Sequence, residues 1–238
     1  MRTFSSALAA ILFLLPACSN AEPQGELITA LEQLAGRGNA DATYHLAMAY
    51  HTGSGVERDP VKALAMFRKA AELGSELASY KLGCYYDGQG AGLVADDAAL
   101  ALKYKLVAAK AGYALAQQDV ASFYARSGKM TEAVTWLEKA AAQGWPEALA
   151  AYASIHNGAA GISPDRAKTD AYFRLFLERE SASPAQLEWL QEFEKKMDTG
   201  EKQRADEIVR NYRPEPKLIT LTALSGQNAA IELVQRHH

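Results

Sequence analysis

The chain has 238 residues, and its 28 Asp and Glu slightly outnumber its 25 Lys and Arg, which gives a formal net charge of −3 at pH 7. This length is enough to bury a sizeable core in one or two domains. The mildly acidic balance, without a run of Lys or Arg, argues against a nucleic-acid partner. Alanine is abundant and β-branched residues are few, a composition that favours closely packed helices over sheet.

The N-terminal stretch, residues 1–17, has the pattern of a signal peptide. Arg2 gives it a positive start, and Ala7–Leu15 is an uncharged apolar run. That run is shorter than the roughly 20 apolar residues that a membrane-spanning helix needs. We therefore expect the chain to be exported and this segment to be removed.

A lipobox-like sequence ends this stretch at Leu15-Pro16-Ala17-Cys18. It resembles the cleavage site of bacterial lipoproteins, in which the cysteine becomes the mature N-terminus and carries the lipid. The resemblance implies lipidation at Cys18. Because Ser19 stands where an aspartate would retain the protein at the inner membrane, it also implies an outer-membrane lipoprotein that faces the periplasm. The alternative is an ordinary signal peptide cleaved nearby, which would discard Cys18 and leave a periplasmic protein.

Cys84 is the one cysteine besides Cys18. If Cys18 is lipidated, no intramolecular disulfide can form. A metal site of the Cys/His type also lacks ligands, so no metal is expected.

Residues 18–26 are polar and contain Pro and Gly, so they are expected to form a tether. Residues 27–37 carry apolar side chains at helical spacing and predict an N-terminal cap helix.

The centre of the chain consists of four copies of one pattern, in residues 38–73, 74–111, 112–143 and 144–180. A glycine stands at or next to the start of each copy, an alanine follows it after four residues, a core residue after eight, and Tyr or His after twelve. These residues are Gly38, Ala42, Leu46 and Tyr50; Gly74, Ala78, Leu82 and Tyr86; Gly112, Ala116, Val120 and Tyr124; and Gly144, Ala148, Tyr152 and His156. Because intervals of four share one helical face, each copy predicts a packed first helix, helix A.

A second helix, helix B, is predicted in the later half of each copy. Asp or Thr stands where it would begin, and these side chains can accept from the unpaired amides of a first helical turn. The capping residues are Asp59, Asp96, Thr131 and Asp165. Alanines at fixed positions let the helices approach closely, and one helix pair cannot bury its own apolar face, so the copies are expected to stack.

The pattern resembles the Sel1-like repeat family, a relative of the tetratricopeptide repeat. The residues that fit the family's string are Leu82-Gly83, Tyr50, Gly53-Ser54-Gly55-Val56, Asp59, Ala63, Ala70-Ala71 and Gly74. The resemblance implies an all-α fold, a right-handed α/α superhelical solenoid of about four Sel1-like helix-pair repeats with helical caps. The fourth copy departs most, because Thr169 and Phe176-Leu177 replace its alanines.

Residues 181–213 are predicted to be C-terminal capping helices. Ser183-Pro184 is a helix-start signal, and apolar spacing predicts one helix to about Asp198 and another over Glu201–Tyr212. In the tail, residues 214–238, the alternation of Lys217–Thr222 favours an extended segment. A short helix is compatible with Ala229–Gln235.

No catalytic motif or phosphate-binding glycine loop is present, and no cofactor or small-molecule substrate is expected. His45 is interpreted as a solvated helix residue, and His156 as a structural substitute for a repeat tyrosine. In the related repeat families helix A lines a concave wall, which implies a partner-binding surface at the helix A positions not needed for packing. Those positions are Met48, His51, Cys84, Asp87, Gln118, Ser122, Arg126, Ser154 and Asn157.

The resemblance implies a non-enzymatic protein–protein interaction scaffold or adaptor of the bacterial cell envelope, which binds a protein or peptide on its concave helix A surface. One alternative is an envelope enzyme, such as a β-lactam-binding or hydrolysing Sel1-like protein. It is disfavoured because the cysteine-rich relatives of that kind carry a disulfide in each repeat, and Cys84 as a nucleophile would need a base such as His51. A second alternative is a secreted or surface factor that interacts with a host.

Overall fold

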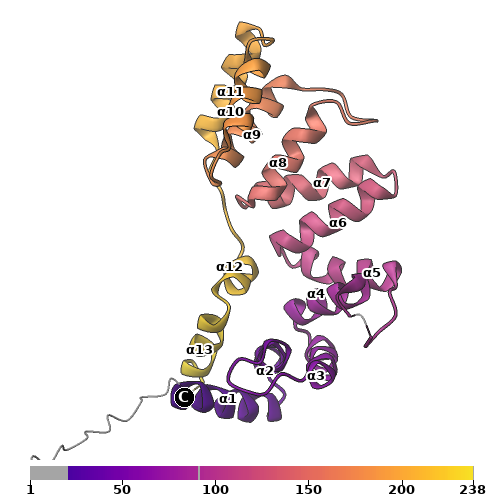
Figure 1. The fold of residues 1–238 in the computed structure, drawn as a ribbon, viewed down its shortest axis with the longest axis vertical. Coiled ribbons are helices and arrows are strands. Elements are labelled where there is room, and N and C mark those ends of the chain that lie inside the picture. Colours follow the sequence, from indigo (N-terminus) through magenta and orange to yellow (C-terminus); the bar gives the residue numbers. More distant parts are fainter. Residues whose placement is uncertain (1–20, 91, 238) are drawn as a thin grey trace, which may run out of the picture.

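The computed structural model describes residues 21–90 and 92–237, so the expected signal peptide and Cys18 lie outside the described residues. Within those ranges every regular element is helical and no strand occurs. The helices form an elongated, curved stack, and the C-terminal residues run back along one side of it (Figure 1). The predicted all-α solenoid of helix pairs is confirmed.

Four helix pairs form the body of the stack. They are α2 (Ala40–Thr52) with α3 (Pro60–Glu72), α4 (Glu76–Cys84) with α5 (Ala98–Lys110), α6 (Ala114–Arg126) with α7 (Met130–Ala141), and α8 (Pro146–His156) with α9 (Arg166–Leu177). A short π-helical segment, η1 (Tyr85–Gln89), continues α4. Each of these helices packs mainly against its neighbours in the sequence, as in a solenoid.

The predicted packing face of helix A is buried in all four pairs. The alanines at Ala42, Ala78, Ala116 and Ala148 have no exposed surface, and the residues four positions later, Leu46, Leu82, Val120 and Tyr152, are at most 3% exposed. The glycines that precede helix A end the previous helix in the left-handed region, where a side chain would be strained; Gly74 and Gly112 both have a φ of 98°. Residue size thus fixes both the spacing of the helices and the turns between them.

The predicted helix B caps are confirmed at Asp59 and Asp165, whose side chains accept from backbone amides of the first turn. The other two predictions were wrong by one or two residues. Asp97, not Asp96, caps α5, and α7 begins at Met130 after Lys129, before Thr131. Asp96 and Asp97 offer equivalent caps in sequence, whereas α7 starts at Met130 without a side-chain cap.

The prediction of a tether is wrong for residues 21–26. Helix α1 (Ala21–Gly36) includes them, and it packs against α2 through Leu31, which is 1% exposed. Pro23 lies in the first turn of α1, where its missing amide costs no helical hydrogen bond, so it does not break the helix.

Two further helices, α10 (Pro184–Glu194) and α11 (Thr199–Asn211), follow the last pair as predicted. Both pack against α9. Ser183 and Asp198 form capping boxes with Gln186 and Glu201, which stabilise the two helix starts.

The tail is helical, so the extended segment predicted at Lys217–Thr222 was wrong. It forms α12 (Leu218–Ser225) and α13 (Gln227–Gln235) and crosses from α11 back to α1 (Figure 1). Helix α13 packs against α1 and α2, with Leu233 in their apolar cluster. Contacts with residues more than 100 positions earlier decide the conformation of this segment. The alternation of polar and apolar residues in Lys217–Thr222 carries no information about these distant contacts.

Gln143 joins the tail to the solenoid. Its side chain is largely buried, and its Nε2 donates to the carbonyl of Gly112 at 2.7 Å. Its Oε1 accepts from the backbone amide of Lys217 at 2.9 Å and from the hydroxyl of Thr220 at 2.8 Å. The Thr220 hydroxyl oxygen in turn accepts from the amide of Ala114. One side-chain amide therefore anchors α12 to the turns between repeats.

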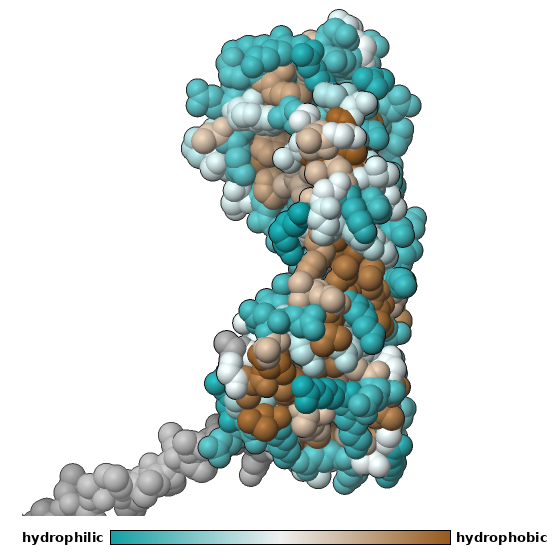
Figure 2. Space-filling model, turned by 90° about the vertical axis from the view of Figure 1, so that its right-hand side faces the viewer, coloured by the Kyte–Doolittle hydropathy of each residue, from teal (hydrophilic) through white to brown (hydrophobic). Residues whose placement is uncertain are grey.

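Among the described residues, no helix is long and apolar enough to cross a membrane. The side of the molecule opposite the tail shows apolar patches between hydrophilic surfaces, and a notch indents the left-hand outline of this view near mid-height (Figure 2). The exposed apolar side chains of the solenoid include Val61 on α3 and Val107 on α5.

Candidate partner-binding surface

A buried lysine occupies a core position of the second repeat. Lys105 on α5 stands seven residues before the closing glycine and is 4% exposed. The equivalent residues in the first and third repeats are Phe67 and Leu137, both buried and apolar. A charge in place of a core hydrophobe needs partners, because desolvating an unpaired ammonium group is costly.

Two carboxylates supply those partners. The Lys105 Nζ lies 2.6 Å from Asp87 Oδ2 on η1 and 2.7 Å from Asp119 Oδ2 on α6. The Tyr80 hydroxyl donates to the same Asp119 oxygen at 3.2 Å. We call Lys105, Asp87, Asp119 and Tyr80 the lysine cluster. It links α4, α5, α6 and η1 through one buried cation.

Gly83 makes room for the lysine stem. A Cβ atom at Gly83 would lie 2.6 Å from Lys105 Cγ and 3.1 Å from the carbonyl oxygen of Ala101. Real Cβ contacts are longer than this, so α4 and α5 could not pack as closely with any other residue at this position. The glycine of the Leu-Gly pair that identifies the repeat in sequence thus also leaves the space that the Lys105 side chain occupies.

The lysine cluster presents negative charge at the surface. Burial alone would lower the pKa of Lys105, but its bonds to Asp119 and Asp87 outweigh that effect and raise it, so the ammonium stays charged. The side chains of Asp87 and Asp119 keep 36% and 27% of their surface exposed. One buried positive charge therefore holds two partly exposed carboxylates in fixed positions.

Cys84 lies beside the lysine cluster but not on the surface. It is 4% exposed, so the expectation that it lines an open wall was wrong. Burial raises the pKa of its thiol, and the nearby Tyr80 and Lys105 only partly offset this. The Nδ1 of His51, the base that a thiol nucleophile would need, lies 2.9 Å from the hydroxyl of Tyr85. Cys84 is thus a neutral core residue, whereas a catalytic thiol requires a lowered pKa.

The remaining predicted residues form separate groups along the stack. Gln118, Ser122 and Arg126 follow one another on α6, where the Ser122 hydroxyl donates to the Gln118 carbonyl and Arg126 lies over the Phe123 ring. Ser154 and Asn157 line a pocket of about 190 Å³ between α8, α9 and α10. Asp87 belongs to the lysine cluster, and Met48 lines a different pocket. The structure therefore brings Asp87 and the α6 residues onto adjoining elements and keeps the others apart.

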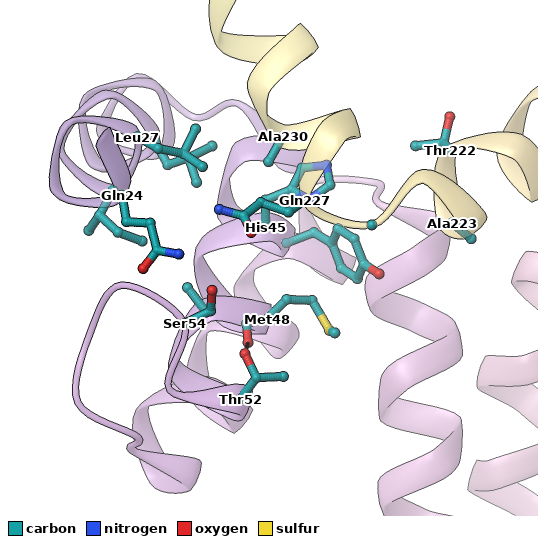
Figure 3. A pocket seen from close by; sticks show the side chains of 15 residues that line it. Gln24, Leu27, His45, Met48, Thr52, Ser54, Thr222, Ala223, Gln227 and Ala230 are labelled. Atoms are coloured by element: carbon teal, nitrogen blue, oxygen red, sulfur yellow. Dashed lines mark hydrogen bonds between the residues drawn. The ribbon is translucent and has the colours of Figure 1, made fainter. Parts of the chain in front are cut away.

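The pocket that Met48 lines, which we call the N-terminal pocket, lies between α1, α2 and the two tail helices (Figure 3). Its volume is about 230 Å³. Leu27 comes from α1, His45 and Met48 come from α2, and Ala223 and Ala230 come from the tail. Segments from both ends of the chain thus meet around one space.

His45 was interpreted as solvated, and this was wrong. Only 9% of its surface is exposed, and its ring meets that of Tyr44 edge to face at 5.1 Å. Burial lowers the pKa of His45 to about 4, so the imidazole is neutral at pH 7. His156 is buried against Tyr152, with the ring centroids 4.6 Å apart, at the packing position that its place in the repeat predicted.

Sequence reasoning missed the lysine cluster and the burial of His45. Aligning the repeats on their closing glycines would have found Lys105, because a charge there replaces Phe67 and Leu137. His45 had no such signal, since the equivalent positions, Lys81, Asp119 and Ala151, are all partly exposed.

Comparison with known proteins agrees with the solenoid of helix pairs. The model of the Sel1 repeat family matches residues 40–75, 77–113 and 116–145. No curated protein matches the chain. A solved protective antigen present in uropathogenic Escherichia coli strains, which displays an SLR fold, is 23% identical over 91% of this chain with a TM-score of 0.62, and the chain spans 48% of that protein. A Sel1 repeat protein from Oxalobacter formigenes is also 23% identical, with a TM-score of 0.60, over 84% of this chain and 92% of its own.

The matched segments coincide with three of the four helix pairs, α2–α3, α4–α5 and α6–α7. The pair α8–α9 lies beyond the match and continues the same stacking. At this level of identity the two solved structures show a shared fold. The matched segments and the continuous solenoid together show that residues 40–145 carry three Sel1 repeats.

Proposed function

We propose that this protein is a non-enzymatic scaffold that binds a protein or an extended peptide on its helix A surface. The observation that carries the proposal is the lysine cluster, in which a buried cation fixes the partly exposed carboxylates of Asp87 and Asp119. Charge-assisted hydrogen bonds from ionised acceptors are among the strongest that a surface can offer. Amide or guanidinium donors of a partner would find these oxygens already oriented.

The adjoining side chains suit the same role. Ser122 and Arg126 are exposed on α6, the helix that also carries Asp119. Mixed polar groups of this kind fit an extended peptide, whose backbone both donates and accepts. The neutral, buried thiol of Cys84 supports a binding role over an enzymatic one.

Rearranging the charges on α6 should remove partner binding. We expect the variant Ser122→Arg with Arg126→Glu to lose proteins that the wild-type chain captures from envelope extract. Lys110→Glu is the matched control, since it reverses an exposed charge on α5. Quantitative mass spectrometry of the captured proteins is the measurement. If all three chains retained the same proteins, the helix A surface would not be the binding site.

We further propose that the scaffold works in the bacterial cell envelope, tethered by a lipid on Cys18. The support is the apolar run that ends in Leu15-Pro16-Ala17-Cys18. A single acyl chain binds a membrane weakly, and more than one gives stable anchoring.

Metabolic labelling with palmitate tests the anchor. The full chain should take up label and fractionate with the outer membrane, whereas Cys18→Ser should take up none. Cys84→Ser is the control for labelling at the other cysteine and should behave like wild type. Equal labelling of wild type and Cys18→Ser would exclude the lipobox.

A further inference from the structure

The N-terminal pocket has the chemistry of a ligand site. Its wall is largely apolar, with Leu27, Ile28 and Leu31 from α1 and Met48 and Ala49 from α2. Among the described residues that line it there is no Asp, Glu, Lys or Arg, and the polar ones are uncharged amides and hydroxyls together with His45. A charged molecule would lose its hydration without gaining a partner there, so the pocket favours a neutral occupant.

The volume sets the size of that occupant. An apolar cavity of about 150 Å³ is enough to hold a benzene molecule. At about 230 Å³, the N-terminal pocket has room for one ring with a small substituent. It could not enclose a long acyl chain or a folded peptide segment.

His45 supplies the specific polar contact. It is 91% buried on the wall of the pocket, and no hydrogen bond joins its ring to any other residue that the structure describes. Its ring nitrogens are not among the sealed polar atoms that lack a partner, so a group bound in the pocket can reach and pair with them. In the neutral ring one nitrogen donates and the other accepts, and either suits a hydroxyl group.

We propose that the N-terminal pocket binds a small neutral molecule with a ring-sized apolar body and one hydroxyl-type group that hydrogen-bonds to His45. This site is independent of partner binding on the helix A surface. Because Ala223, Gln227 and Ala230 of the tail form part of the wall, the same ligand would hold the tail against α1 and α2. A ligand that bridges two segments stabilises their contact by mass action.

Two probes that share a methyl-substituted ring and differ by one hydroxyl group test the hydrogen bond. We expect p-cresol to bind the full-length protein several-fold more tightly than toluene, since a net hydrogen bond contributes about 1 kcal/mol and 1.4 kcal/mol is a factor of ten. Titrations followed by ¹H–¹⁵N correlation spectra give both affinities and locate the shifts. In His45→Leu the two probes should bind equally, with toluene close to its wild-type affinity.

A second variant and a second readout distinguish binding in the N-terminal pocket from binding at other surfaces. Met48→Trp, which fills the pocket from its half-buried wall, should abolish binding of both probes while the protein still unfolds cooperatively. In the wild type p-cresol should slow amide exchange in α13. The proposal is overturned if neither probe binds at millimolar concentration, if wild type does not prefer p-cresol, or if the shifts lie away from α1, α2 and α13.

Discussion

Lys105→Ala is expected to lower the free energy of unfolding by about 3 kcal/mol, near the lower end for a broken buried ion pair. The lower end applies because the side chains of Asp87 and Asp119 keep 36% and 27% of their surface exposed and can rehydrate in part. Two like charges would remain close together between η1 and α6, and the removed stem would leave a cavity beneath Gly83. Urea denaturation measured by circular dichroism at constant pH gives the change.

Companion variants distinguish the loss of charge from the loss of volume. Lys105→Met keeps an unbranched stem but leaves the carboxylates unpaired, so it should remain destabilised by about 2 kcal/mol. Adding Asp87→Asn and Asp119→Asn should recover most of that loss, because neutral amides tolerate the apolar neighbour. Lys103→Ala, an exposed lysine on the same helix, is the control and should be nearly neutral. A cost below about 0.5 kcal/mol for Lys105→Ala would mean that the lysine cluster does not stabilise the fold.

The repeats could be predicted because the sequence features that specify each helix pair lie within that pair or its neighbour. Alanine spacing, turn glycines and caps repeat along the chain, and each is satisfied within one helix pair or its neighbour. The same locality explains the misplaced cap at Asp96, since the adjacent Asp97 can take the same role, whereas α7 starts without any side-chain cap. Such errors shift a boundary without changing the fold.

The tail could not be predicted in this way. Its helices depend on Gln143, on Thr220 and on the apolar cluster around Leu31. None of these contacts is visible in the local pattern of Lys217–Thr222. Distant contacts override weak local propensity, especially in a short segment.

The two candidate sites also differ in whether local sequence reveals them. Lys105 could be read from the sequence by comparing repeats, because it breaks a periodic rule at a core position. The burial of His45 follows from the docking of α13, which covers α2 but not the later helix A elements. A position that is partly exposed in three repeats is thus closed in the first by a segment from the other end of the chain.

Acidification should reveal the burial of His45. Its pKa falls from 6.5 in the unfolded chain to about 4 in the folded protein because of burial. The unfolded state therefore binds the proton first, so this stabilisation is fully present above about pH 6.5 and is lost as the pH falls toward 4. The size is about 3 kcal/mol, since each unit of pKa difference corresponds to about 1.4 kcal/mol.

The measurement is the difference between wild type and His45→Leu, in which all other titrating groups are shared. Free energies of unfolding from urea titrations at pH 7, 6, 5 and 4 should fall more steeply for wild type, and the difference between the two proteins should become constant below about pH 4. His51 and His156, whose pKa values burial also lowers, contribute equally to both proteins and cancel. His51→Gln is the matched control and should change the slope less, because His51 is only partly buried. Parallel curves for wild type and His45→Leu would show that His45 binds protons equally in the folded and unfolded states. That result would contradict the burial of its ring.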